Sequence, residues 1–328
     1  MTSSSRLLSL AVMAISVLGL LADAPASAQG TYPSQPIKFI VPYAAGGLPD
    51  TVARIVGQKL SDRLGHAVVV ENRAGANGSI AAAALASAPA DGYTFMVTDG
   101  SMLSVNPLLF KDLNYDPKKD FVPVALVARA PLFLASHPSL PATDLKGFID
   151  YVKANPAKVN YGSSGVGSTH HLSMEAMKAA LNLDMAHVPY RGTGQSVPAL
   201  LGGHVQVLFS AYPSLAGAAE SKKVNLLATN GAKRSPQAPN VPPIAEVIPG
   251  FDFSVMVGIL ARAGTPPAIV EKISSEAVAA VKMDDVAKQY AAVGIEQDGA
   301  GSADFATEIA KEIERVANVV RSANIKIQ

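Results

Sequence analysis

The chain has 328 residues, 49% hydrophobic and 16% charged, and its 27 lysines and arginines against 26 aspartates and glutamates leave a net charge of +1. This near-neutral balance argues against binding nucleic acid through its phosphates. The absence of cysteine excludes disulfides, thiolate catalysis, zinc–thiolate sites and thioether lipid anchors, and the absence of tryptophan argues against an aromatic sugar-binding groove. The length suits about two domains.

The first 28 residues have the pattern of a secretory signal peptide. Arg6 supplies the positive charge, Leu7 to Leu21 form the apolar region, and Ala26-Ser27-Ala28 offers small residues for cleavage after Ala28. The alternative is an uncleaved membrane anchor, but the apolar run of about 15 residues is shorter than the roughly 20 that span a bilayer. We therefore expect a mature protein in the periplasm, released from the signal peptide and not anchored to lipid.

The mature chain alternates short apolar runs with amphipathic stretches. Helices are predicted over Thr51–Leu64, Ile80–Ala88 and His170–Leu183, after the N-cap pair Thr265-Pro266, and from Phe305 to Val320. The alternation predicts an α/β fold with mostly parallel sheets and right-handed crossovers. The apolar runs show little polar alternation, which is typical of strands buried on both faces; they are Ile37–Val41, Ala67–Glu71, Thr94–Thr98, Val124–Ala128, Leu132–Ser136, Val159–Tyr161, His187–Pro189, Val205–Ser210, Asn225–Ala228 and Phe253–Leu260.

Two glycine-rich loops each follow a predicted strand and open a predicted helix. The first is Pro42-Tyr43-Ala44-Ala45-Gly46-Gly47-Leu48-Pro49-Asp50, and the second is Tyr161-Gly162-Ser163-Ser164-Gly165-Val166-Gly167-Ser168-Thr169. Glycine pairs adopt positive φ and let the backbone approach a ligand, while the free N–H groups of a helix start favour an anion. One such loop is more often only a tight turn. Two of them on different domains could face each other across a cleft and hold one anionic ligand.

Neither loop carries a complete enzyme signature. No Walker lysine follows either loop, Val166 stands where a G-x-S-x-G motif around Ser164 needs glycine, and the second loop lacks the G-x-G-x-x-G spacing. An esterase that uses Ser164 with His170 lacks an acidic third partner and is the remaining enzymatic alternative.

Each polar residue near the loops has more than one interpretation. His171 and Glu175 lie one helical turn apart beside His170 and could bind a metal, but the pattern is no zinc signature and a surface hydrogen bond is commoner. His170 could instead fix the shape of the second loop. Asp50 could complement the helix dipole, orient the first loop or meet a ligand amine. Arg191 could be solvated or could place a guanidinium near the cleft.

Short motifs in a fixed order run through nearly all of the mature chain. They are Tyr32-Pro33, Pro36-Ile37, Pro42-Tyr43, Gly46-Gly47, Asp50, Ala53-Arg54, Leu64-Gly65, Val69-Val70-Glu71-Asn72-Arg73, Gly75-Ala76-Asn77-Gly78, Asp91-Gly92-Tyr93-Thr94, Asn106-Pro107, Tyr115-Asp116-Pro117, Asp120-Phe121, Pro123-Val124, Tyr161-Gly162-Ser163, Gly167-Ser168, His171-Leu172, His187-Val188-Pro189-Tyr190-Arg191-Gly192, Leu201-Gly202-Gly203, Val241-Pro242-Pro243, Glu246, Pro249-Gly250-Phe251 and Gly264-Thr265-Pro266. Together they resemble the Bug-type extracytoplasmic solute receptors of tripartite tricarboxylate transporters.

The resemblance implies a type II periplasmic-binding-protein fold, in which two α/β lobes close on a ligand at their hinge. Lobe 1 would comprise residues 29–130 and 252–328, lobe 2 residues 131–251, and the chain would cross near Val124–Leu134 and Phe253–Ala261. The implied protein is a monomeric receptor, not an enzyme, without cofactor, metal or nucleic acid. It would deliver a small carboxylate, such as a di- or tricarboxylate or an aromatic acid, to the membrane subunits of the transporter. The expected ligand-binding residues are Tyr43, Ala44, Ala45, Gly46, Gly47, Asp50, Ser101, Ser163, Ser164, Gly167, Ser168, Thr169, His170, Tyr190, Arg191 and Ser210.

The chain departs from the common family pattern where ligand identity is read. Ser163-Ser164 and Thr169 replace a more glycine-rich version of the second loop, and Gly194-Gln195-Ser196-Val197 replaces a more alanine-rich segment. The identity of the carboxylate therefore stays open. A sensor that presents its ligand-bound form to a signalling receptor would need the same cleft, so the sequence leaves that alternative open too.

Overall fold

The computed structural model describes residues 32–43, 45–75, 78–110, 113–190 and 192–322. By its internal packing the chain divides into Met1–Ser34 and Gln35–Gln328, and the second unit holds both sheets described below. The expected signal peptide, residues 1–28, lies outside the described residues, so its cleavage stays a prediction. Within the described ranges, no helix combines the length and the apolar character needed to cross a membrane.

The first sheet has six strands. Their order across the sheet is β11 (Glu296–Ala300), β4 (Phe121–Ala130), β10 (Val255–Arg262), β3 (Thr94–Asp99), β1 (Ile37–Val41) and β2 (Val68–Asn72). Strand β1 pairs in parallel with β2 and β3, whereas β10 is antiparallel to β3 and β4, and β11 is antiparallel to β4.

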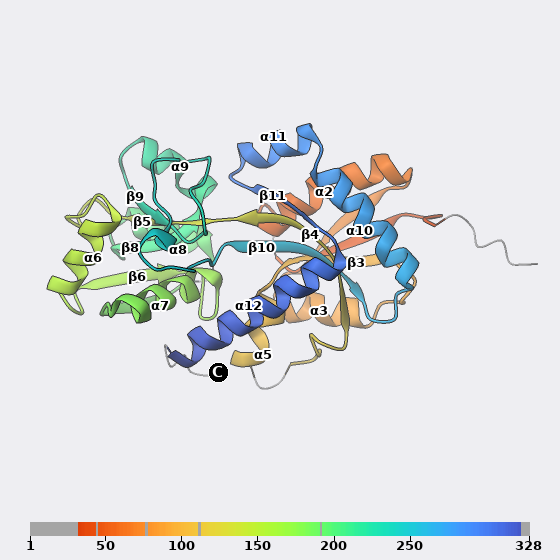
Figure 1. The fold of residues 1–328 in the computed structure, drawn as a ribbon, viewed down its shortest axis with the longest axis horizontal. Helices are drawn as coiled ribbons and strands as arrows, with labels where there is room; N and C mark the ends of the chain where they lie inside the picture. The colour runs from red at the N-terminus through yellow and green to blue at the C-terminus, as the bar shows by residue number, and fades with distance from the viewer. Residues whose placement is uncertain (1–31, 44, 76–77, 111–112, 191, 323–328) are drawn as a thin grey trace, which may run out of the picture. The chain divides into compact units, whose positions relative to one another are not determined.

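Helices cover both faces of the first sheet (Figure 1). On one face, α3 (Ser79–Ala86), the short α4 (Ser101–Ser104) and α12 (Ser302–Ser322) pack against Ile40, Met96 and Leu260 of the sheet. The other face carries α2 (Leu48–Leu64) and α10 (Pro267–Val281), which contact each other and the sheet. Two further helices flank this sheet, α5 (Asn106–Leu109) after α4 and α11 (Asp284–Ala292) beside β11.

The second sheet has five strands in the order β7 (Met185–Pro189), β6 (Val159–Ser163), β8 (Val207–Ala211), β5 (Leu132–Ser136) and β9 (Asn225–Thr229). Strand β6 is parallel to β7 and β8, and β5 is antiparallel to β8 and β9. Helices α8 (Thr193–Leu201) and α9 (Tyr212–Glu220) pack against Phe133 and Ala135 of β5. Helices α6 (Leu145–Ala154) and α7 (Thr169–Leu181) also contact this sheet, and the 3-10 turn η2 (Ile244–Glu246) follows β9.

Both sheets are arranged in the same way. In the first sheet β1 lies between β2 and β3, and β10, which follows a strand of the second sheet, pairs antiparallel with β3. In the second sheet β6 lies between β7 and β8, and β5, which follows a strand of the first sheet, pairs antiparallel with β8. We refer to the two α/β halves as lobe 1, around the first sheet, and lobe 2, around the second. The expected boundaries at residues 130/131 and 251/252 stay a prediction.

Two sequence predictions are wrong in detail. The sheets are mixed: β5 and β10, which each follow a strand of the other sheet, enter antiparallel to a neighbour, and β11 adds an antiparallel edge strand beside β4. Thr265 does not cap helix α10: Pro266 stands at the cap position, the helix begins at Pro267, and the Thr265 hydroxyl donates to Arg262 O at 2.8 Å.

Candidate functional site

The strand order locates one point in each lobe where a ligand is expected. In lobe 1 the chain leaves β1 for β2 on one side and returns to β3 on the other, so right-handed crossovers send the loops after β1 and β3 to opposite faces. Lobe 2 repeats this at β6 and β8. Ligands of open α/β sheets bind at such switch points, outside the carboxyl ends of the strands. The two glycine-rich loops follow β1 and β6.

Asp50 holds the first glycine loop in shape. Its carboxylate, only 2% exposed, accepts hydrogen bonds from Gly46 N at 2.8 Å, Arg54 Nε at 3.0 Å and Asn72 Nδ2 at 2.9 Å. Asn72 Nδ2 also donates to Tyr43 O at 3.0 Å, so the end of β2 is bonded to both ends of the loop. Burial alone would raise the pKa of Asp50, but these donors outweigh it and hold that pKa below its usual value. Of the roles considered for Asp50, orienting the loop is the one that these contacts support.

A second polar cluster joins the loops after β1 and β3. Tyr43 Oη donates to Asp99 Oδ1 at 2.7 Å and lies 3.1 Å from Ser101 Oγ, and Ser101 N donates to the same Asp99 oxygen at 3.0 Å. The Ser101 hydroxyl also bonds to Asp99 Oδ1. Burial, followed by the Asp99 charge, raises the pKa of Tyr43 well above its usual value, so Tyr43 is a neutral donor. Sequence reasoning selected Tyr43 and Ser101 but missed Asp99, whose place directly at the end of a buried strand was the available signal.

The second loop is held by its own hydroxyls and by two histidines. Ser168 caps α7 by accepting from His171 N at 3.3 Å, and its hydroxyl donates to Gly165 O at 2.8 Å. Gly167 N donates to His171 Nδ1 at 3.1 Å. The fully buried Ser163 Oγ lies 2.7 Å from His187 Nε2. The role of fixing this loop, considered for His170, therefore belongs to His171, with His187 as a support that the sequence did not reveal.

Three aromatic rings form a stack beneath the second loop. The rings of His171 and His187 lie 4.0 Å apart at 12°, and Tyr161 stacks on His187 at 4.8 Å. Burial lowers the pKa of His171 to about 4 and that of His187 to about 3, so both rings are neutral near pH 7. Glu175 accepts from Tyr161 Oη and from Lys178 Nζ, so the expected His171–Glu175 hydrogen bond is wrong. The described part of the chain contains no group of three acidic or histidine side chains able to hold a metal.

Several expected ligand-binding residues present polar atoms without a protein partner. Within the described ranges, Ser164 Oγ, His170 Nε2 and Ser210 Oγ are buried and make no hydrogen bond. Ser164 lies within the second loop, His170 directly follows it, and Ser210 lies near the end of β8 at the lobe 2 switch point. Burial lowers the pKa of His170 to about 4. Buried polar groups are normally paired, so atoms left open at a switch point are suited to a ligand.

The remaining expected residues lie at the same strand ends. Ala45, Gly46 and Gly47 belong to the first loop, Gly167 and Thr169 to the second, and Tyr190 follows β7 with its N–H donating to Ser163 O at 3.1 Å. Ala44 and Arg191 lie outside the described residues. The expectation that both glycines of the first loop have positive φ is wrong for one: Gly46 has φ +84°, but Gly47 is extended at φ −75°.

Comparison with known proteins identifies the family. The model of the tripartite tricarboxylate transporter family receptor matches residues 52–325. The chain belongs to this family. It is 35% identical to BugT of Bordetella pertussis over 326 residues, which cover 99% of each chain. A structure of an R. palustris protein with adipate is 32% identical, with a TM-score of 0.83 and coverage of 90% of this chain and 100% of that one. MatC from Rhodopseudomonas palustris with bound malate is 31% identical, with a TM-score of 0.76 and coverage of 88% and 100%.

These matches confirm the predicted Bug-type receptor family and the two-lobe α/β fold. The receptor is thus a solute-binding protein of a periplasmic family.

Proposed function

We propose that this receptor captures a small carboxylate between its two lobes and delivers it to the membrane subunits of a tripartite transporter. The observation that carries the proposal is the pair of glycine-rich loops at equivalent switch points, each opening a helix. Helix N-termini offer unpaired N–H groups and the positive end of the helix dipole to an anion. In lobe 2 the unpartnered Ser164 Oγ, His170 Nε2 and Ser210 Oγ add polar atoms suited to carboxylate oxygens.

Recognition in this proposal relies on hydrogen bonds more than on paired charges. Arg54, the cation bonded within the first loop, is committed to Asp50. Arg191 stays a candidate for a direct contact. Adipate and malate, which accompany two structural neighbours, are the first ligands to test.

A thermal-shift screen tests the ligand class. Adipate, malate, citrate and benzoate are titrated against the mature protein, with the uncharged diamide of adipate as control. An acid present at about 100 times its Kd should stabilise the fold by about 2.7 kcal/mol. The proposal fails if no carboxylate raises the melting temperature, or if the diamide does so equally. Uptake of the best acid in a strain that lacks the permease subunits then separates transport from sensing.

Two further experiments on the exported protein test its location and the closure of its lobes. Mass spectrometry of the exported protein should give a chain that starts at Gln29, whereas a mature product that retains residues 7–21 would contradict a free periplasmic receptor. Small-angle scattering at saturating ligand should give a smaller radius of gyration than the free protein, because a ligand held by both lobes favours their closure.

A further inference from the structure

Asn230, the residue after β9, forms hydrogen bonds to both of the segments that connect the lobes, through its backbone and through its side-chain amide. Its own N–H donates to Leu132 O at 2.9 Å and its own carbonyl accepts from Phe253 N at 2.7 Å. The side-chain amide repeats the pattern in reverse: Oδ1 accepts from Leu132 N at 2.7 Å and Nδ2 donates to Phe253 O at 2.6 Å. All four backbone groups of Leu132 and Phe253 are therefore bonded to one fully buried residue.

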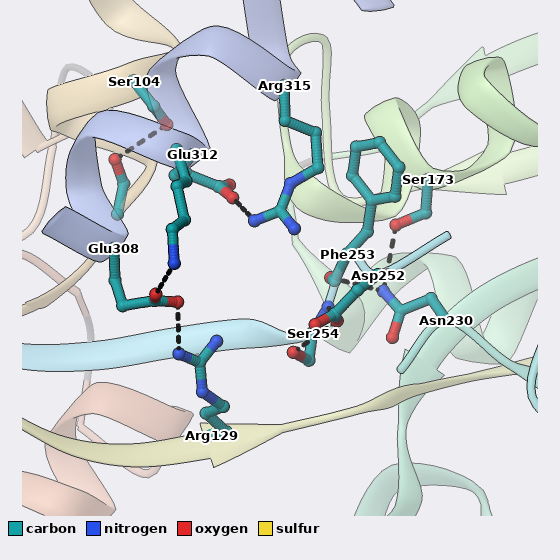
Figure 2. Close-up of polar contacts among 12 residues, drawn as sticks. Ser104, Arg129, Ser173, Asn230, Asp252, Phe253, Ser254, Glu308, Glu312 and Arg315 are labelled. Carbon is teal, nitrogen blue, oxygen red and sulfur yellow. Dashed lines mark hydrogen bonds and ion pairs between the residues drawn. The ribbon is translucent and has the colours of Figure 1, made fainter. Parts of the chain in front are cut away.

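The same amide is bonded to the helix that carries the second loop. Asn230 Nδ2 donates to Ser173 Oγ at 3.0 Å, and Ser173 is buried on α7 about one turn beyond the Ser168 cap. Figure 2 shows Asn230 between Ser173 on one side and Phe253 on the other. Leu132, Phe253 and the start of α7 are thus joined through a single side chain.

A different cluster fixes the lobe 1 side of the connecting segments. Arg129, one residue before the end of β4, pairs with Asp298 Oδ2 of β11 at 2.6 Å and with Glu308 Oε2 of α12 at 2.8 Å. Figure 2 shows the Arg129–Glu308 pair of this cluster apart from the Asn230 contacts. The β4–β10 ladder continues to the pair Ala130 and Val255, so lobe 1 is bonded as far as those two residues.

Only two residues lie between these bonded regions. The residue on the first connecting segment is Pro131, which has no N–H to donate. On the second it is Ser254, whose N–H and hydroxyl both bond to Asp252 Oδ1 two residues earlier and to neither sheet. Hinges are a few residues that absorb the change in backbone angles while the elements on either side stay rigid.

We propose that the lobes rotate about Pro131 and Ser254, and that Asn230 is the positioning residue that fixes the lobe 2 edge of this hinge and connects it to the ligand-binding helix α7. The part of this inference in which a ligand closes the lobes rests on the proposed function, but the hinge can be tested in the protein without ligand. When Asn230 holds both connecting segments, they turn together; when it does not, Leu132 and Phe253 move separately and the angle between the lobes is less well defined.

The test measures the distance between the lobes directly. Because the chain has no cysteine, spin labels can be placed at Gln58→Cys on α2 and Ala154→Cys on α6, both exposed positions. Distances are recorded by pulsed electron resonance for the otherwise wild-type protein, Asn230→Asp and Ser173→Ala. Asn230→Asp keeps the shape and the Leu132 contact but replaces the donating amide NH2 group with an acceptor oxygen that opposes Phe253 O. Ser173→Ala removes only the contact to α7 and covers the case in which Asn230→Asp fails to fold.

Ser274→Ala is the matched control, since Ser274 is a buried serine on α10 and belongs to neither connecting segment. In the free protein we expect a broader distance distribution for Asn230→Asp and a smaller change in the same direction for Ser173→Ala, with Ser274→Ala unchanged. Faster hydrogen exchange at the Phe253 amide should accompany the broadening in Asn230→Asp, because the Phe253 segment loses its bond to the side chain of residue 230, whereas the Leu132 amide keeps its acceptor. Distributions that match the wild type in both hinge variants, with stability reduced only as in Ser274→Ala, would show that Asn230 is merely structural.

Repeating the measurement with adipate and with malate separates this inference from the proposed function. If neither acid shifts the wild-type distance, ligand-driven closure by these acids fails, while the ligand-free comparison still decides the role of Asn230.

Discussion

Gly46 and Gly65 provide a matched test of the first loop. They stand at the two ends of α2 with φ of +84° and +70°, and a Cβ added at either would meet no atom within 4 Å. Alanine at each position is therefore strained only through its backbone, by about 1–2 kcal/mol for an L-residue in the left-handed region. Gly46 belongs to the candidate site, and Gly65 ends the same helix away from it.

We expect the two substitutions to differ in binding and to resemble each other in stability. Gly65→Ala should lower the free energy of unfolding by about 1–2 kcal/mol and leave ligand affinity unchanged. In Gly46→Ala the same strain favours a rearranged loop that loses the Gly46 N to Asp50 contact, and binding must restore the original loop. The affinity should therefore fall by up to about 5- to 30-fold, since 1.4 kcal/mol corresponds to a factor of ten.

Urea denaturation and calorimetric titration with the best acid from the screen measure the two quantities. Gly47→Ala adds a third comparison, because its φ of −75° accepts alanine without strain, so a loss of affinity there would report contact with the ligand. Equal affinity for Gly46→Ala and the wild type would exclude the first loop from the site. Equal losses for Gly46→Ala and Gly65→Ala would mean that general destabilisation, not the loop, is responsible.

Three further predictions concern stability. Burial lowers the pKa of His171 to about 4 and that of His187 to about 3, below the unfolded value near 6.5. The unfolded chain therefore binds protons first, and the free energy of unfolding should fall as the pH drops from about 6.5 towards 4. Urea denaturation at a series of pH values measures this slope, and His187→Phe should flatten it. Asp50→Ala should cost about 1–3 kcal/mol in the same assay, because it removes a buried carboxylate that accepts hydrogen bonds from Gly46, Arg54 and Asn72, and a loss below about 0.5 kcal/mol would contradict its role in the loop. Gly258→Ala places a Cβ 2.1 Å from Phe305 Cζ and should destabilise by about 1–3 kcal/mol, and Phe305→Leu should recover part of that loss in a double mutant.

The strands were predictable wherever burial imposed a continuous apolar run. The predicted ranges Ile37–Val41 and Leu132–Ser136 agree with β1 and β5 at both ends, because every residue of these strands except Lys38 is buried. Strand β11, Glu296–Ala300, has the sequence EQDGA and lies at a sheet edge, so no apolar pattern marked it. The direction of β10 was not predictable either, because a buried strand is apolar whether its neighbours run parallel or antiparallel.

The residues of the candidate site were also predictable only in part. The two loops were predictable because glycine, hydroxyl residues and a helix start follow one another in sequence. Asp99, His187 and Asn230 were missed because their partners are distant in the chain: Asp99 meets Tyr43 across 56 positions, and Asn230 meets Leu132 across 98. A single side chain with long-range partners leaves no periodic or local pattern, and only the tertiary structure brings its contacts together.

The pairing of β4 has a consequence for the order in which the protein can form. Both neighbours of β4 in its sheet, β10 and β11, are synthesised more than a hundred residues after it, whereas β5 to β9 complete the five-stranded sheet from one continuous stretch. As the chain emerges from the ribosome, the second sheet can be assembled while β4 still lacks both partners. Contacts between distant segments form slowly, because a long loop must first be closed. The last part of the chain to be made is therefore needed to finish the sheet that began first.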